Sequence, residues 1–112
     1  MMIEITVKAH LDSVLSAPVY FEQPESPPES FVLIEKTGSG RTNKLNSSTF
    51  AFQSYAGSMY AAATLNEAVK AAVDSLVTLD EIASVKLNSD YNFTDTETKR
   101  YRYQAVYDIK HY

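Results

Sequence analysis

One amphipathic helix constrains the fold of this chain more than any other segment. Between Ser58 and Val77 the apolar side chains recur at the helical period and form a single stripe. The residues of this stripe are Leu65, Val69, Ala72, Val73 and Leu76. The hydroxyl of Ser58 can cap the first turn, and the alanines at 61–63 have high helix propensity. A helix with one apolar face must bury that face, so we expect it to pack on a sheet, while its alanines would also let a neighbouring subunit approach closely.

The segment before this helix begins with a shorter helix. Apolar residues at helical spacing predict a helix over residues 3–15, which Pro18 ends. A brief extended segment follows at 19–21. Residues 22–29 are acidic and rich in proline, and consecutive prolines hold a chain in an extended path without amide donors. We therefore predict that residues 22–29 form a surface connector.

Two strands are predicted between the connector and the central helix. The continuous apolar run Phe31–Ile34 is typical of a strand that is covered on both faces. Residues 37–44 hold two glycines and several polar residues, which favours a flexible hairpin tip. From 48 to 55 the apolar residues alternate, so that Phe50 and Phe52 share one face.

After the helix, two more strands are predicted. Residues 82–93 form the first, residues 92–98 a polar turn, and residues 100–112 alternate cleanly between two faces. The order of helix, three strands, helix and two strands predicts an α+β fold: a mainly antiparallel sheet of about five strands, packed by the central helix and the short N-terminal helix. The side chains expected to be largely buried are Leu33, Phe50, Phe52, Leu65, Val69 and Val73.

The composition restricts the functions that are open to the chain. Its 112 residues form one domain, 1–112. Ten Lys and Arg residues against 14 Asp and Glu give a net charge of −4, which argues against a protein that grips nucleic-acid phosphates. The lack of cysteine excludes disulfides and thiolate chemistry. No stretch reaches the ~18 apolar residues of a membrane span, so we expect no membrane partner.

Two sequence patterns resemble ligand-binding sites but lack the required spacing or number of residues. A phosphate loop needs GxxxxGK[ST] followed directly by a helix, whereas a predicted strand follows residues 38–42. His10 and His111 are too few and too isolated to hold a metal ion. We expect no metal site and no cofactor.

Catalytic and nucleic-acid patterns are equally weak. The carboxylates Glu25 and Glu29 lie in the connector, Asp80 and Glu81 follow the helix, and no serine stands in a GxSxG motif, so we expect no catalytic residues and no enzyme. Residues 99–103 mix basic and aromatic side chains as single-strand binders do. In a strand, however, the arginines and tyrosines would point to opposite faces.

Six short segments carry a resemblance to a known group of proteins. They are PVYFEQP (18–24), VLIEKTG (32–38), QSYA (53–56), SMY (58–60), residues 63–69 and YRYQAVY (101–107). Together they span nearly the whole chain, which resembles the tail terminator or head-to-tail joining proteins of tailed-phage morphogenesis modules of the Gram-positive type, a group that includes minor tail and minor capsid proteins.

The resemblance implies a structural protein of the virion neck or tail, present in the host cytoplasm before assembly. It implies a homo-oligomeric ring, a hexamer, that caps the tail tube protein and joins it to the head connector proteins. DNA would pass through such a ring without sequence-specific binding. Two alternatives from other classes stay open: a monomeric ligand-binding domain, and an accessory domain of prophage origin that contacts nucleic acid.

The charge distribution predicts how such subunits meet. Residues 1–30 hold one base and five acids, while residues 31–57 hold three bases and one acid. A head-to-tail contact needs two different, complementary patches on each subunit. The predicted interface residues are Lys36, Arg41 and Lys44 around the tip, and Glu22, Glu25 and Glu29 in the connector. We also expect the tip, 37–46, to be mobile in the isolated subunit and to become ordered at this interface.

Overall fold

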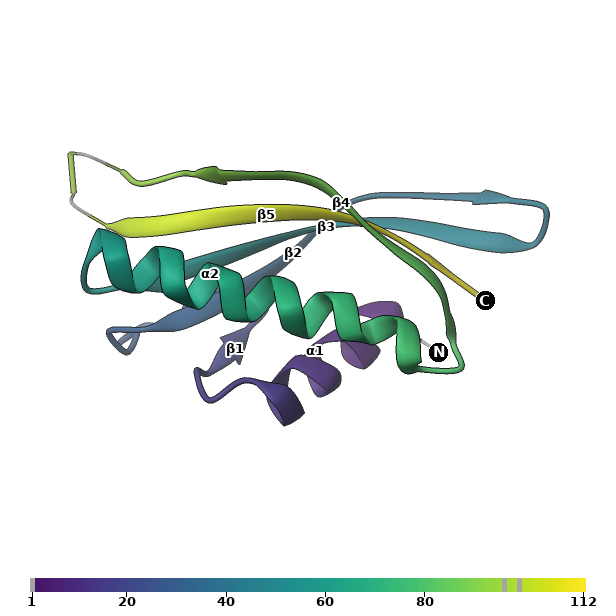
Figure 1. Cartoon of the computed structure of the whole chain (residues 1–112), viewed down its shortest axis with the longest axis horizontal. Helices are drawn as coiled ribbons and strands as arrows, with labels where there is room; N and C mark the ends of the chain where they lie inside the picture. Colours follow the sequence, from purple (N-terminus) through teal and green to yellow (C-terminus); the bar gives the residue numbers. More distant parts are fainter. Residues whose placement is uncertain (1, 96, 99) are drawn as a thin grey trace.

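A five-stranded sheet with two helices on the same side forms the protein (Figure 1). The structure is a computed structural model that describes residues 2–95, 97–98 and 100–112. The elements in chain order are α1 (Ile3–Val14), β1 (Val19–Tyr20), β2 (Phe31–Thr42), β3 (Leu45–Ala56), α2 (Met59–Asp74), the short 3-10 helix η1 (Ser75–Thr78), β4 (Ile82–Asn92) and β5 (Tyr101–His111). The α+β class is therefore confirmed.

The sheet is mixed, which corrects the prediction of a mainly antiparallel sheet. Its order is β1-β2-β3-β5-β4, and β1 pairs with β2 in parallel while the other neighbours are antiparallel. The reason is the proline-rich connector. An extended segment of this length cannot make a tight hairpin turn, and it carries the chain back to the end from which β1 started.

The core lies between the helices and the sheet. Val69, Val73, Phe50 and Phe52 are all fully buried there, as predicted. Ser58 caps α2 as expected, because its Oγ accepts a hydrogen bond from the amide of Ala61 at 3.1 Å.

Two predicted core residues, Leu33 and Leu65, are only partly buried. Leu33 is paired with Gln53 on the sheet face opposite the helices, since its neighbours in β2 alternate with it. Leu65 lies at the flank of α2 and lines a surface groove. A helical stripe in the sequence therefore does not show where the covered part of the helix ends.

The β2–β3 hairpin is longer and more regular than predicted. The strands continue to Thr42 and resume at Leu45, so the flexible tip expected over 37–44 is mostly paired backbone. A register shift between Lys36 and Gly38 interrupts the ladder once. Among the residues that the structure describes, β1 pairs only with Val32 and Leu33 of β2, so no strand lies beside the outer edge of the distal half of β2.

The last strand confirms the predicted alternation and occupies an interior position. Ala105, Tyr107 and Ile109 are buried toward the helices, while Val106 and Asp108 between them are half-buried. β5 lies between β3 and β4 and pairs with both along nearly its full length. The two chain ends lie at the same end of the molecule as the turn of the β2–β3 hairpin (Figure 1).

Candidate interaction surfaces

The turn of the β2–β3 hairpin presents two basic side chains at one end of the molecule. All of residues 35–44 are exposed, including Arg41 and Lys44. The turn residues Asn43 and Lys44 both have positive φ, 53° and 66°. Lysine in this conformation costs about 1 to 2 kcal/mol, and the second position of such a turn favours glycine. Lys44 therefore holds its charge at the turn at a local cost in stability.

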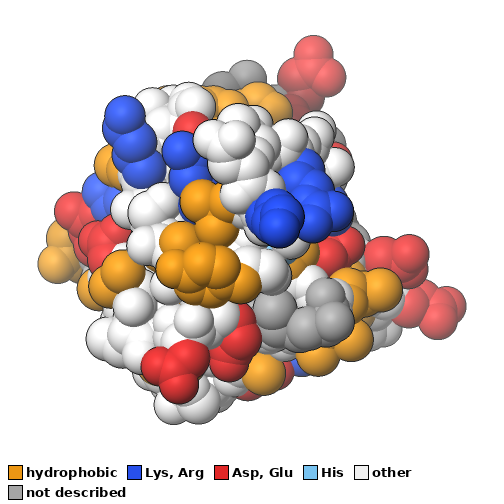
Figure 2. All heavy atoms as spheres, turned by 90° about the vertical axis from the view of Figure 1, so that its right-hand side faces the viewer, with side chains coloured by type: hydrophobic (Ala, Val, Ile, Leu, Met, Phe, Trp, Pro, Cys, Tyr) orange, Lys and Arg blue, Asp and Glu red, His pale blue; other side chains and the backbone are white. Residues whose placement is uncertain are grey.

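Figure 2 looks directly at this end of the molecule. Lys and Arg side chains gather over its upper part, with hydrophobic side chains between them. Acidic side chains lie below and to the sides. The end is thus a mixed surface with a basic region.

Lys36 does not belong to the basic tip. It sits beside the register shift, opposite Phe50, whereas Arg41 lies opposite Asn46 near the turn. Its Nζ is 3.7 Å from Glu4 Oε2 on α1, so a carboxylate of the same subunit already compensates part of its charge. Of the three predicted basic interface residues, Arg41 and Lys44 lie beside the turn, whereas Lys36 lies farther along the hairpin and lines one cavity with Arg41.

The acidic connector reaches the opposite end of the molecule. Glu22, Glu25 and Glu29 are all exposed. The Glu29 carboxylate lies against Gly57, just before α2, and occupies the space that a Cβ on Gly57 would need. A carboxylate beside the N-terminal end of a helix is stabilised by the helix dipole.

The sheet separates Glu29 from the basic tip. The twelve residues of β2 make eleven steps of ~3.3 Å each, which place the start of β2 roughly 36 Å from its turn. The molecule itself measures 44 × 24 × 24 Å. Glu29 and the tip therefore cannot meet within one subunit, whereas Arg100 lines the same small pocket as Glu29.

An apolar groove lies beside the first turns of α2. Its volume is about 640 Å³, and residues from the α1–β1 link and from α2 line it. The lining residues are Ser16, Ala17, Pro18, Ser30, Tyr60, Ala61, Thr64, Leu65 and Ala68. Tyr60 is 82% exposed. The alanine-rich sequence hinted at a close approach here, but the groove itself could not be predicted because Pro18 and Ser30 are distant in the sequence.

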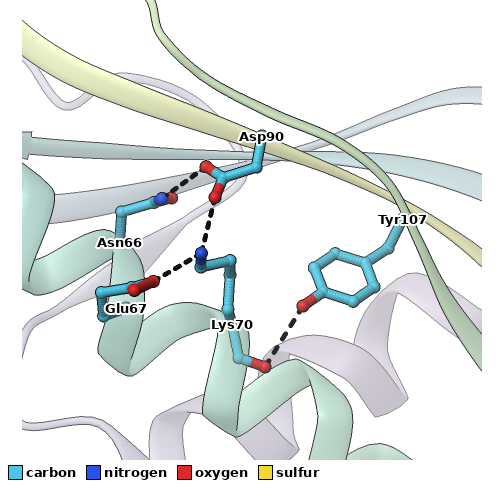
Figure 3. A network of polar contacts seen from close by, with 5 residues as sticks. All are labelled: Asn66, Glu67, Lys70, Asp90 and Tyr107. Atoms are coloured by element: carbon cyan, nitrogen blue, oxygen red, sulfur yellow. Dashed lines mark hydrogen bonds and ion pairs between the residues drawn. The ribbon is translucent and has the colours of Figure 1, made fainter.

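A network of polar contacts ties α2 to the sheet (Figure 3). Lys70 Nζ donates to Asp90 Oδ2 at 2.5 Å and lies 2.5 Å from Glu67 Oε2, and Asn66 Nδ2 donates to Asp90 Oδ1 at 2.7 Å. The hydrogen bond to Asp90, then that to Glu67, raises the pKa of Lys70, so the amine stays protonated. Tyr107 donates to the carbonyl of Lys70 at 3.4 Å.

The protonation states of this network suit a role in stabilising the packing of α2 on the sheet. Burial, reinforced by the nearby Asp74 carboxylate, raises the pKa of Tyr107, so the phenol stays neutral. Neither the amine nor the phenol can act as a base at neutral pH. The amide of Asn66 is buried with its Oδ1 unpaired, which lowers the stability of the fold at this point.

Both histidines contact serines. His10 Nε2 is 2.7 Å from Ser75 Oγ, and His111 Nε2 is 2.9 Å from Ser48 Oγ. Burial lowers the pKa of His111, so the ring is neutral at pH 7. A catalytic serine also needs a group that orients its histidine, and within the described residues neither ring is hydrogen-bonded to a carboxylate. The pairs are therefore best explained as satisfied polar contacts.

The basic and aromatic residues of 99–103 are divided between two faces, as predicted for 100–103; Lys99 lies outside the described residues. Arg102 donates to the Tyr55 hydroxyl at 2.8 Å and to the Phe93 carbonyl at 2.7 Å, and its guanidinium lies 4.3 Å from the Phe93 ring centre. Tyr55 in turn stacks on Phe31 at 4.5 Å. The arginine is thus engaged in covering the helix-free face of the sheet, where the rings of Tyr55 and Phe31 are buried.

Residues 2–95, 97–98 and 100–112 contain no group of three or more His, Cys, Asp or Glu side chains that could hold a metal ion. In the same residues, no helix is long and apolar enough to span a membrane. No family model matches this sequence. No curated protein sequence matches it either.

Proposed function

We propose that the protein is a structural subunit that assembles head to tail into a closed ring. The observation that carries the proposal is the separation of two complementary patches: Arg41 and Lys44 lie at one end of the sheet, and Glu29 lies at the other. Patches of opposite charge at opposite ends cannot pair within a subunit, and they favour a heterologous contact that repeats from one copy to the next.

The resemblance to tail terminator and head-to-tail joining proteins gives this ring a place. In the proposal it is a hexamer in the neck of a tailed phage, where it caps the tail tube and joins it to the head connector, and DNA passes through it. Both helices pack on one face of the sheet, so the opposite face, the hairpin and the free outer edges of β2 and β4 remain available to neighbouring proteins.

The second candidate is a monomeric ligand-binding domain. It is favoured by a cavity of about 690 Å³ at the base of the hairpin, which Lys36, Arg41 and His111 line together with the start of α1. The two functions differ in mass. Light scattering over a range of concentrations should give six times the 12.5 kDa of the subunit for a closed hexamer, whereas a binding domain stays at the subunit mass.

The test of the assembly contact is charge reversal at the tip. The variant Arg41→Glu with Lys44→Glu should lose ring formation at low salt, because two carboxylates would then face the acidic patch of the neighbour and repel it. Raising the salt to about 0.5 M, where screening acts within a few ångströms, should reduce the difference between the variant and the wild type.

The matched control reverses Lys8 on α1 and Lys86 on β4, two bases outside the turn, and changes the net charge by the same amount. If the tip variant forms rings as well as this control does, the tip is not at the interface. Negative-stain microscopy of the wild type then decides whether the rings have six-fold symmetry.

A further inference from the structure

The groove beside α2 is lined by small side chains that leave room for the backbone of another chain. Small side chains line it, including Ala61 and Ala68, so a neighbouring chain could approach the helix closely. Tyr60 stands beside it with 82% of its surface exposed. A large exposed aromatic residue next to an apolar groove is typical of a surface that a partner covers.

The turn of the β2–β3 hairpin has the matching convex shape. It is narrow, because only Asn43 and Lys44 connect the two strands, and the residues around it are exposed. Leu45, at the start of β3, is partly exposed and supplies an apolar contact. The hairpin lies at the far end of the long axis from the start of α2 (Figure 1).

The charges around the two surfaces are complementary. Glu29 lies beside Ser30, which lines the groove, and next to Gly57 at the start of α2. Arg41 and Lys44 flank the turn of the hairpin. A hairpin seated in the groove would therefore carry its bases toward Glu29.

We propose that the groove beside α2 binds the β2–β3 turn of a second copy of this chain. This deepens the head-to-tail assembly proposed above and rests on it. The tip supplies backbone and Leu45 to the apolar floor, and Arg41 or Lys44 pairs with Glu29 at the rim. The small side chains of the groove set the fit, while the charges set the orientation.

The first test fills the groove. Ala68→Arg places a long side chain in it, and Ala71→Arg places the same side chain one turn along the same helix, outside the groove lining. Both alanines are exposed, so both variants should keep the melting temperature of the wild-type monomer. We expect Ala68→Arg to weaken assembly at least tenfold in subunit concentration and Ala71→Arg to leave it within about twofold. Equal effects of the two variants on assembly would refute the binding of the hairpin in the groove.

The second test uses the absence of cysteine from the chain. Thr42→Cys on the hairpin and Thr64→Cys in the groove are both exposed, and together they should give disulfide-linked multimers under mild oxidation. The control pair is Thr42→Cys with Thr78→Cys, which is exposed on η1. Rings that form without cross-linking above this control would refute the docking while leaving the ring itself intact. A wild-type protein that stays monomeric at every concentration would refute both.

Discussion

Val69 and Leu65 lie one helical turn apart on α2 and provide a sensitive test of where the core ends. Val69 is fully buried, whereas Leu65 is partly buried and lines the groove. Side-chain size alone predicts the larger loss for Leu65→Ala, which removes three carbons instead of two. The structure predicts the opposite order in the monomer.

The magnitudes follow from burial. Val69→Ala removes two buried methyl groups, which costs ~1.6 kcal/mol in transfer free energy, and the cavity left behind raises the loss to about 2 to 3 kcal/mol. At Leu65 the removed carbons already touch solvent, and the space opens into the groove, so the loss should be about 1 kcal/mol. For a domain of this size the first loss lowers the melting temperature by roughly 10 °C.

The assay is urea unfolding followed by the fluorescence of the chain's eight tyrosines, since it has no tryptophan. The protein must be dilute enough to remain monomeric, because assembly adds stability. In the assembled state Leu65→Ala should weaken ring formation, and Val69→Ala should not do so beyond its effect on folding. A loss of unfolding free energy at Leu65 equal to or larger than that at Val69 would contradict this account of the core and the groove.

Three further predictions concern single side chains. Lys44→Gly should raise the unfolding free energy of the monomer by about 0.5 to 1 kcal/mol, because the left-handed conformation suits glycine, and should weaken ring formation; a change of both in the same direction would be inconsistent with a base kept for contact. For His111, burial is the main cause of the lowered pKa, with Lys36 lowering it further and Glu4 and the Tyr112 backbone raising it. The unfolded chain therefore binds the proton more readily, so the contribution of His111 to stability is complete above pH 6.5 and falls as the pH drops toward the folded pKa. The variant His111→Gln should make the unfolding free energy depend less on pH between pH 7 and 5. An unchanged pH dependence would exclude His111 as its source. Lys70→Met and Asp90→Asn should show a coupling free energy of roughly 0.5 to 1 kcal/mol in a double-mutant cycle at pH 7. Because the pKa of Lys70 is raised, the coupling should persist at pH 10.5 and disappear only above this pH. Loss of the coupling already at pH 9.5 would argue against the network of Figure 3.

Local patterns explain how much of the fold was predictable. The helical stripe with its Ser58 cap and the alternation of β5 are properties of short segments, and both appear in the structure as expected. The parallel pairing of β1 depends on how the connector returns across the molecule, which no short segment encodes. Sequence patterns placed Lys36 with the tip because it is near Arg41 in the chain, and only the fold brings Glu4 to it.

The charged segments of the predicted interface were likewise recognisable from local sequence. Region sums of charge identified the two oppositely charged segments, and the strand length then separates them in space. The groove, the network around Lys70 and the burial of His111 all combine residues from distant parts of the chain. A period or a spacing in one segment carries no signal for such sites.

The interior place of β5 has a consequence for how the chain folds. β2 and β3 are neighbours in sequence and can pair early, but β3 meets β5 through contacts such as Phe50 with Tyr107, which are far apart in the chain. In the described part of the chain, β4 has no partner in the sheet except β5. During synthesis, at ~5 to 20 residues per second, β4 must therefore wait unpaired, and the inner edge of β3 stays open, until residues 101–111 emerge. Closure of the sheet is then a late, non-local step, and a chain interrupted before it would expose two strand edges to aggregation.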